Sequence, residues 1–274
     1  MPKGFVFELP DAVYPKISEL KKLEELKIIW EDWIIERQNA FPAKYGDIAL
    51  LLPVEVDEQL LKAIILFSDP CYRCFSFNRE DLIPTVEKYD ALLRISSPNS
   101  DKVFCKKSKK VPFRNKLAQM TNIDASVFVL ITRLKGKNEC VQYDFLERYI
   151  IENNNDDRVI DIFALVVYET LIFPQSPGYI DAIVVDLIEQ IDNQVNLVPA
   201  IIAETIRSLN YCRRKGEGSF IGYAQLLYIW IQSHFWGKCE ASLRFYMNTM
   251  VPVKEFCQKE WPKDQTKEQW VVAF

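Results

Sequence analysis

The sequence predicts an all-α protein of roughly a dozen helices, with one small β-hairpin near residues 74–84. Apolar residues recur at three- and four-residue steps through most of the chain, which is the period of helices with one buried face. Glycine is scarce, at 8 of 274 residues, and this disfavours turn-rich β architectures. One short stretch alternates apolar and polar residues in the manner of a half-buried strand.

The N-terminal part is predicted as three helices. The first covers 16–40 and ends before Pro42, because proline removes a helical hydrogen bond. A short helix follows over 47–52. Asp57 then has the position of an N-cap for a helix that reaches Phe67. The apolar stripe of the first helix consists of Ile17, Leu20, Leu23, Leu26, Ile29, Trp30, Trp33 and Ile34.

The hairpin is predicted where the helical period breaks. Phe75 and Phe77 alternate with polar residues, and a polar turn precedes the next apolar pair. Thr85 is expected to cap a helix that ends at Arg94. The residues that follow, 95–112, are rich in Ser, Asn and Lys, which favours a loop.

After this loop the chain is predicted as an almost unbroken helical series. The expected helices are 113–121, 125–135, 142–153, 157–173, 179–193, 198–214, 219–236, 241–248 and 254–261. A last helix opens at Thr266, which has capping-box spacing to Gln269. Because that helix is cut after two turns, we expect a truncated C-terminus.

The domain organisation follows from these elements. We expect a single helical domain over 16–274, and the alternative is two subdomains, 16–94 and 113–274, joined by the basic loop 95–112. The uncharged stretch Gly218–Gly237 carries several polar side chains. It is therefore expected to be a buried central helix rather than a membrane span.

Composition excludes several kinds of site. A single histidine in the chain leaves little room for imidazole-based metal sites or proton relays. The seven cysteines are odd in number, scattered and without a signal peptide, which favours reduced thiols in an intracellular protein. Cys71 and Cys74 form a CxxC pair, but no second pair completes a zinc site. We expect no metal, no cofactor, no membrane partner and no assigned catalytic residue.

Charge is distributed unevenly along the chain. Residues 95–120 hold seven basic residues and one acid, whereas 144–192 hold eleven acids and two bases. These two segments could bind a nucleic acid, a partner protein or each other, or form ordinary solvated surfaces. The loop lysines are Lys106, Lys107, Lys109 and Lys110.

A second candidate anion or nucleic-acid contact lies at the start of helix 219–236. There Arg213, Arg214 and Lys215 would face the free N–H groups of the helix and could bind an anion. The simpler interpretation of Gly216, Gly218 and Gly222 is a helix C-cap followed by a tight turn. Phe75 and Phe77, with Arg73 and Arg79 nearby, form an exposed-looking aromatic and basic set that could also contact nucleic acid.

A candidate polar cleft involves Glu204, Arg207 and His234. His234 ends the most apolar helix, and Glu204 would be its acid–base partner. Cys212 or Cys239 could join it as a nucleophile. The simpler interpretation is a histidine in the core or at a helix end, with Glu204 and Arg207 as a buried ion pair that fixes helix register.

Two segments carry a family resemblance. They are CFSFNREDLIPTVEKYDALLRI and PAIIAETIRSLNYCRRKGEGSFIGYAQLLYIWIQSHFW. Here the chain resembles a group of plant proteins related to the aminotransferase-like plant mobile domain, which is associated with transposons. The matching positions are Phe75, Phe77, Glu80, Pro84, Thr85, Glu87, Leu92, Leu93, Pro199, Glu204, Thr205, Arg207, Arg213, Arg214, Gly216, Glu217, Gly218, Gly222, Ser233, His234, Phe235 and Trp236.

The resemblance implies a nuclear or transposon-derived domain that acts through protein or nucleic-acid interaction. It supplies no catalytic residues, and a pyridoxal-phosphate enzyme would need an α/β fold that this sequence does not predict. The leading hypothesis is thus a non-enzymatic interaction domain. The alternative is an enzyme of unknown reaction with a helical cleft around Glu204, Arg207, Arg213 and His234, and a third possibility is a decayed reading frame.

Overall fold

The structure is a computed structural model, and it describes residues 13–15, 20–77, 80–95, 111–136, 138–173, 178–192, 195–215, 218–220, 224–235, 258 and 265–273. These residues are mainly α-helical, with twelve α-helices and one 3-10 helix. The predicted fold class is confirmed. The helix expected at 241–248, the helix expected at 254–261 except residue 258, and the loop lysines at 106–110 lie outside the described residues.

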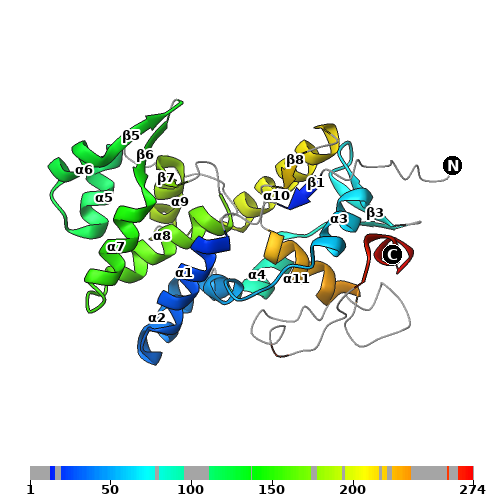
Figure 1. Cartoon of the computed structure of the whole chain (residues 1–274), viewed down its shortest axis with the longest axis horizontal. Coiled ribbons are helices and arrows are strands. Elements are labelled where there is room, and N and C mark those ends of the chain that lie inside the picture. Colours follow the sequence, from blue (N-terminus) through cyan, green and yellow to red (C-terminus); the bar gives the residue numbers. More distant parts are fainter. Residues whose placement is uncertain are drawn as a thin grey trace. The chain divides into compact units, whose positions relative to one another are not determined.

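The chain divides into two compact units (Figure 1). Unit 1 comprises residues 1–19, 53–94 and 200–274, and unit 2 comprises 20–52 and 95–199. The two units are therefore interleaved along the chain, whereas the sequence alternative arranges two subdomains one after the other.

Unit 2 is built around one buried helix. Its helices and strands are α1 (Leu20–Glu31), α2 (Ile35–Tyr45), η1 (Gly46–Leu51), α5 (Phe113–Thr121), α6 (Ala125–Ile131), β5 (Thr132–Lys135), β6 (Asn138–Gln142), α7 (Tyr143–Glu152), α8 (Val159–Leu171), β7 (Tyr179–Asp181) and α9 (Ala182–Asp192). Every residue of α8 from Ile162 to Leu171 is buried, and α7 and α9 pack beside it (Figure 1). An aromatic cluster of Trp30, Trp33, Phe41 and Phe163 fixes α1 and α2 against α8.

Unit 1 combines a three-stranded sheet and a two-stranded sheet with five helices. Its elements are β1 (Val13–Pro15), α3 (Glu58–Phe67), β2 (Ser68–Asp69), β3 (Cys74–Phe77), β4 (Glu80–Leu82), α4 (Val86–Leu93), most of α10 (Val198–Lys215), β8 (Gly218–Phe220), α11 (Ala224–Phe235) and α13 (Lys267–Ala273). The predicted hairpin is confirmed as β3–β4, with Phe75 opposite Leu82. All side chains described in α11, from Ala224 to His234, are buried.

The expectation of a single hairpin is wrong. β2 adds a third strand to β3 and β4, and a second antiparallel sheet has the order β5-β6-β7. β1 also pairs in parallel with β8. The strands β5, β7 and β8 lie in segments that helical periodicity assigned to helices. Strands of three or four residues are too short to display a period, and their partners lie elsewhere in the sequence.

The first predicted helix is also corrected. It is interrupted at 32–34, where α1 ends and α2 begins, and α2 continues through Pro42 to Tyr45. Pro42 lacks the N–H that would bond to the carbonyl of Gln38, but the packing of Phe41 and Tyr45 in the core compensates. The prediction that the aromatic residues at the hairpin are exposed is also wrong. Phe75 and Phe77 are only 2% and 3% exposed.

Candidate functional site

The acidic and basic segments of unit 2 bond to each other. Lys116 in α5 is 5% exposed, and its ammonium donates to Asp186 of α9 at 2.7 Å and to Glu189. Arg114, two residues earlier in α5, pairs with Glu139 of β6 at 3.2 Å. Two bases from the segment 95–120 are thus engaged with acids of unit 2, and Lys116 pairs with the acidic segment 144–192, which was one of the possibilities for these charges.

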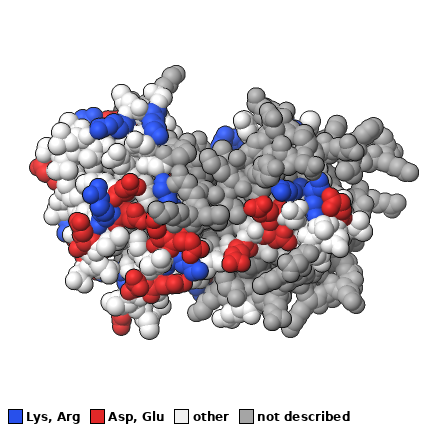
Figure 2. All heavy atoms as spheres, viewed as in Figure 1, with Lys and Arg blue, Asp and Glu red and all other residues white. Residues whose placement is uncertain are grey.

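The electrostatics of Lys116 are consistent with a structural role. Burial lowers the pKa of Lys116, while the hydrogen bonds to Asp186 and Glu189 raise it, and the net effect is a raised pKa. Lys116 therefore stays protonated near neutral pH. Figure 2 shows acidic side chains spread over the face of unit 2 with basic side chains among them. Lys44, which bonds to Asp161 at 2.9 Å, is a further example of this pairing.

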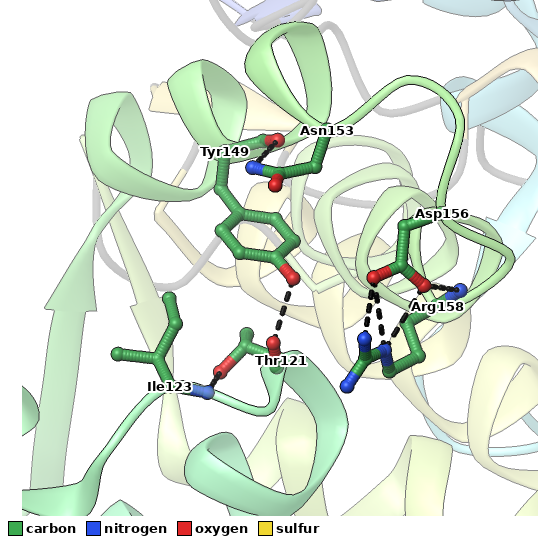
Figure 3. A network of polar contacts seen from close by, with 6 residues as sticks. All are labelled: Thr121, Ile123, Tyr149, Asn153, Asp156 and Arg158. Carbon is green, nitrogen blue, oxygen red and sulfur yellow. Dashed lines mark hydrogen bonds and ion pairs between the residues drawn. The ribbon is translucent and has the colours of Figure 1, made fainter.

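Hydrogen bonds that the sequence did not predict lie at the C-terminus of α5. The Tyr149 hydroxyl of α7 donates to the Thr121 carbonyl at 2.6 Å, and the Thr121 hydroxyl accepts from the N–H of Ile123 at 3.2 Å (Figure 3). Helix C-termini leave carbonyls without intrahelical donors, so this contact satisfies one of them. Nearby, Asp156 accepts three hydrogen bonds from the Arg158 guanidinium. No local sequence signal links Tyr149 to Thr121.

The residues of the predicted polar cleft occupy different environments in unit 1. Glu204 and Arg207 form a bidentate pair on α10, with Nε to Oε2 at 2.8 Å and a second bond from Nη2 to Oε1. The Arg207 side chain is 54% exposed and that of Glu204 11%. Their hydrogen bonds raise the pKa of Arg207. The pair is therefore a surface pair with one sheltered partner, not the buried pair of the simpler interpretation.

His234 lies in the core. It is 1% exposed and its ring stacks on Trp230 with 5.8 Å between centroids. Burial lowers the pKa of His234 to about 4, and the Lys88 ammonium contributes. The imidazole is thus neutral at physiological pH. A core histidine at a helix end, the simpler of the two interpretations, describes this placement.

The predicted anion contacts are described in part. Arg213 is half-buried, and burial lowers its pKa while the Asp69 carboxylate raises it. Arg214 and Lys215 complete α10, but their side chains lie outside the described residues. The turn from Gly216 to Gly222 is described only at β8.

A small pocket lies between the β2–β3 turn and α10. Asp69, Arg73 and Cys74 line it on one side, and Thr205 and Asn210 on the other. It has room for about one water molecule. None of Glu204, Arg207, Arg213 or His234 lines this pocket, so the described geometry does not favour a shared catalytic cleft.

Two of the described thiols, those of Cys74 and Cys212, have a raised pKa, which disfavours the reactive thiolate. Cys212 is fully buried, and burial raises its pKa to about 11. Burial also raises the pKa of Cys74, with the carboxylates of Asp81 and Asp69 contributing. Within the described part of the chain, no three His, Cys, Asp or Glu side chains are arranged to hold a metal ion. The candidate nucleophile Cys239 lies outside that part.

Membrane insertion finds no support in the helices that the structure describes. Among them, none is both long and apolar enough to span a bilayer. The uncharged stretch Gly218–Gly237 contains the short strand β8 and the buried helix α11.

Comparison with known proteins identifies the family. The chain belongs to the family described as Domain of unknown function (DUF7745), whose family model matches residues 26–270. This range begins in α1 and ends at Trp270 in α13, so it includes nearly all of the described elements. No curated protein and no solved structure matches the chain.

Proposed function

We propose that this member of the DUF7745 family is a helical interaction domain of mobile-element origin, which binds a protein or nucleic-acid partner. The observation that carries the proposal is the run of four lysines within 106–110, in the connection between α4 and α5. Such a run in a chain of net charge −4 concentrates positive potential in one segment. The family resemblance adds a nuclear location to the proposal.

The charge pairs of unit 2 support a separate role for these lysines. Arg114 and Lys116 are already bonded to Glu139, Asp186 and Glu189. The lysine run adds four positive charges beyond these structural bases. Arg214 and Lys215, at the end of α10, are the second candidate contact.

The test is the salt dependence of binding. Fluorescence anisotropy with labelled single- and double-stranded DNA and RNA would be measured from 50 to 200 mM salt. K106A/K107A and K109A/K110A are each expected to reduce the slope of log K against log salt by about 1.4 to 1.8, because each neutralised phosphate contact contributes about 0.7 to 0.9. K27A/K62A removes two lysines from α1 and α3 and should leave the slope unchanged.

The protein arm uses the same variants as bait in pull-downs from nuclear extract. A partner retained by wild type and K27A/K62A, but lost by the quadruple variant of Lys106, Lys107, Lys109 and Lys110, would support protein binding. The proposal fails if neither nucleic acids nor extract proteins distinguish the quadruple variant from the wild type. Imaging of a fluorescent fusion tests the nuclear location.

A further inference from the structure

The solvent-facing side of α1 carries acidic and apolar side chains in one row. Glu24, Ile28 and Glu31 follow each other at steps of four and three residues, which places them on the same face of the helix. Ile28 is 56% exposed, and both glutamates are exposed. Leu26 and Trp30, on the opposite side of α1, are buried. The row therefore points away from the core of unit 2.

Two more isoleucines are exposed where α1 ends and α2 begins. Ile34 is 64% exposed and Ile35 is 71% exposed. Ile34 is the N-cap residue of α2 and makes no side-chain cap bond, although isoleucine is among the least favourable residues at an N-cap. A residue that opposes local stability in this way is typical of a functional surface. Together with Ile28, these residues form a concentrated apolar surface between residues 28 and 35.

Four acidic residues accompany these isoleucines in the sequence. Glu24, Glu31, Asp32 and Glu36 are all exposed. Among the residues that the structure describes, none of the four side chains forms a hydrogen bond or an ion pair. Carboxylates without a protein partner are available to the cationic groups of a ligand.

Two basic residues also lie in this region, and they leave its charge negative. The Arg37 guanidinium donates to Oδ1 of Asn154 at 2.8 Å and lies 5.4 Å from the centroid of the Trp33 ring. Lys27 is half-buried. Residues 24–37 hold five acids and two bases, a net charge of −3. A negative potential disfavours the phosphates of nucleic acids and anionic lipids, and it favours a cationic protein segment.

We infer that this part of unit 2 docks a basic amphipathic helix of a partner protein. We name it the α1–α2 surface, and it consists of Glu24, Ile28, Glu31, Asp32, Ile34, Ile35 and Glu36. The surface is separate from the lysine run and opposite to it in charge, so the inference goes beyond the proposed function.

The spacing of the row describes the partner helix. Because a helix rises about 1.5 Å per residue, Glu24 and Glu31 lie about 10 Å apart along α1, with Ile28 between them. A helix that runs antiparallel to α1 matches the row when it presents a leucine between two lysines that are two turns apart. Apolar anchors supply affinity in this mode of recognition, and the ion pairs set the orientation and exclude acidic partners.

The probe is a fluorescein-labelled peptide, Gln-Leu-Leu-Ala-Gln-Lys-Ala-Gln-Leu-Ala-Ala-Gln-Lys-Ala. Its leucines and lysines repeat the spacing of the α1–α2 surface in reverse order. The control peptide has Glu in place of both Lys. Fluorescence anisotropy should show saturable binding of the lysine peptide to the full chain and no binding of the glutamate peptide.

Two variants separate the apolar contribution from the charged one. I34S/I35S should weaken the lysine peptide about tenfold because it removes two apolar anchors, and it should fold because serine is a favoured N-cap residue. E24K/E31K should lose the lysine peptide and bind the glutamate peptide, because the charge of the row is reversed. E55K/E58K makes the same change in net charge at exposed positions of unit 1 and should leave both results unchanged. Circular dichroism would establish that all three variants fold.

Isoleucine methyl NMR locates the contact. The δ1 methyl signals of Ile28, Ile34 and Ile35 should shift when the lysine peptide is added, whereas those of the buried residues Ile162 and Ile188 should not. A lysine peptide with Pro at two of its alanine positions cannot form the helix and should not bind.

Five results would overturn the inference: no saturation by the lysine peptide, equal affinity for the wild type and I34S/I35S, equal affinity for the wild type and E24K/E31K, equal binding of the Pro-containing peptide, or methyl shifts confined to other isoleucines. Self-association of the chain that I34S/I35S abolishes would also overturn it, because the surface would then serve a second copy. The quadruple lysine variant should bind the lysine peptide as tightly as the wild type, and this result separates a failure of the proposed function from a failure of this inference.

Discussion

The indole N–H of Trp270 donates a hydrogen bond of 3.0 Å to the carboxylate of Asp57, which lies 213 positions earlier in the chain. The other carboxylate oxygen of Asp57 caps α3 by accepting from the N–H groups of Gln59, at 2.8 Å, and Leu60, at 3.1 Å. Trp270 is fully buried. One side chain thus begins α3 and attaches the helix α13 to it.

Asp57→Ala is therefore expected to lower the free energy of unfolding by more than the loss of an ordinary cap. Removing a cap costs about 0.5–2 kcal/mol, and leaving the buried Trp270 N–H without its acceptor costs about 1–3 kcal/mol more. Urea denaturation measures the sum. Thr85→Ala, which removes only the cap of α4, is the matched control and should lose the smaller amount.

A double-mutant cycle isolates the hydrogen bond itself. D57A and W270F should be non-additive, because each removes one partner of the same bond. Additivity of the two changes within about 0.5 kcal/mol would contradict the contact.

The single histidine allows a direct titration. Since burial lowers the pKa of His234 to about 4, its side-chain NMR signals should not move between pH 8 and pH 5. The chain has one histidine, so the assignment is unambiguous. A midpoint near 6.5, the usual value for histidine, would show that the imidazole is solvated.

The same pKa has a consequence for acid stability. Below about pH 6.5 the unfolded chain binds a proton on His234 that the folded chain binds only near pH 4. Stability should therefore fall as the pH decreases through this window, by at most about 1.4 kcal/mol per pH unit from this group. His234→Gln should flatten this dependence, as measured by urea denaturation at pH 7, 6 and 5.

Tyr149→Phe tests the network at the end of α5. It removes the donor to the Thr121 carbonyl and should destabilise unit 2 by about 1 kcal/mol. Tyr72→Phe makes the same chemical change at a side chain that is 79% exposed, and it should change stability by less than about 0.5 kcal/mol. Equal effects of the two changes in thermal or urea denaturation would count against the hydrogen bond.

The described thiols should differ in reactivity. Cys71 is exposed, whereas Cys140 and Cys212 are buried, and burial raises the pKa of both buried thiols. Because the thiolate is the reactive form, brief iodoacetamide treatment followed by mass spectrometry should modify Cys71 first. Cys140 and Cys212 should react only after unfolding in urea. Early labelling of Cys212 would indicate an accessible site at the end of α10.

Local chemistry made much of the fold predictable. Asp57, Thr85 and Thr266 were recognisable as caps because a cap bonds within three residues of itself, and all three make those bonds in the structure. The Thr266–Gln269 pair is reciprocal, with bonds of 2.8 and 3.3 Å. Helix positions with clear periodicity, such as those of α5 and α7, were predicted within one residue.

Features that depend on distant partners were not predictable in this way. The residues of β5 fit a helical period as well as a strand, and only pairing with β6 makes them extended. Gly136, with a φ of +63°, was the one local signal for a turn between β5 and β6, but it also suits a helix end. Periodicity alone also predicted one continuous helix where the structure has an interruption between α1 and α2.

The candidate site was predicted less well because the type of a residue does not determine whether its side chain is exposed. Phe75 and Phe77 beside arginines suggested an exposed platform, yet they pack on Trp230 and Phe67. Arg114 and Lys116 lie in a segment that the sequence predicted to be one basic stretch. In the structure they form ion pairs with residues of β6 and α9, which gives them a structural role. The lysine run and the polar cleft stay predictions.

The interleaved arrangement of the two units also determines the order in which they can form during synthesis. All of unit 2 has been synthesised once residue 199 is translated, while unit 1 still awaits its segment 200–274. Until then α3 and the first sheet lack α10, α11 and α13, and their apolar surfaces stay uncovered. Since domains fold as their residues become available, unit 2 should fold first during synthesis. A premature stop between 200 and 270 would then leave a folded unit 2 attached to an incomplete unit 1.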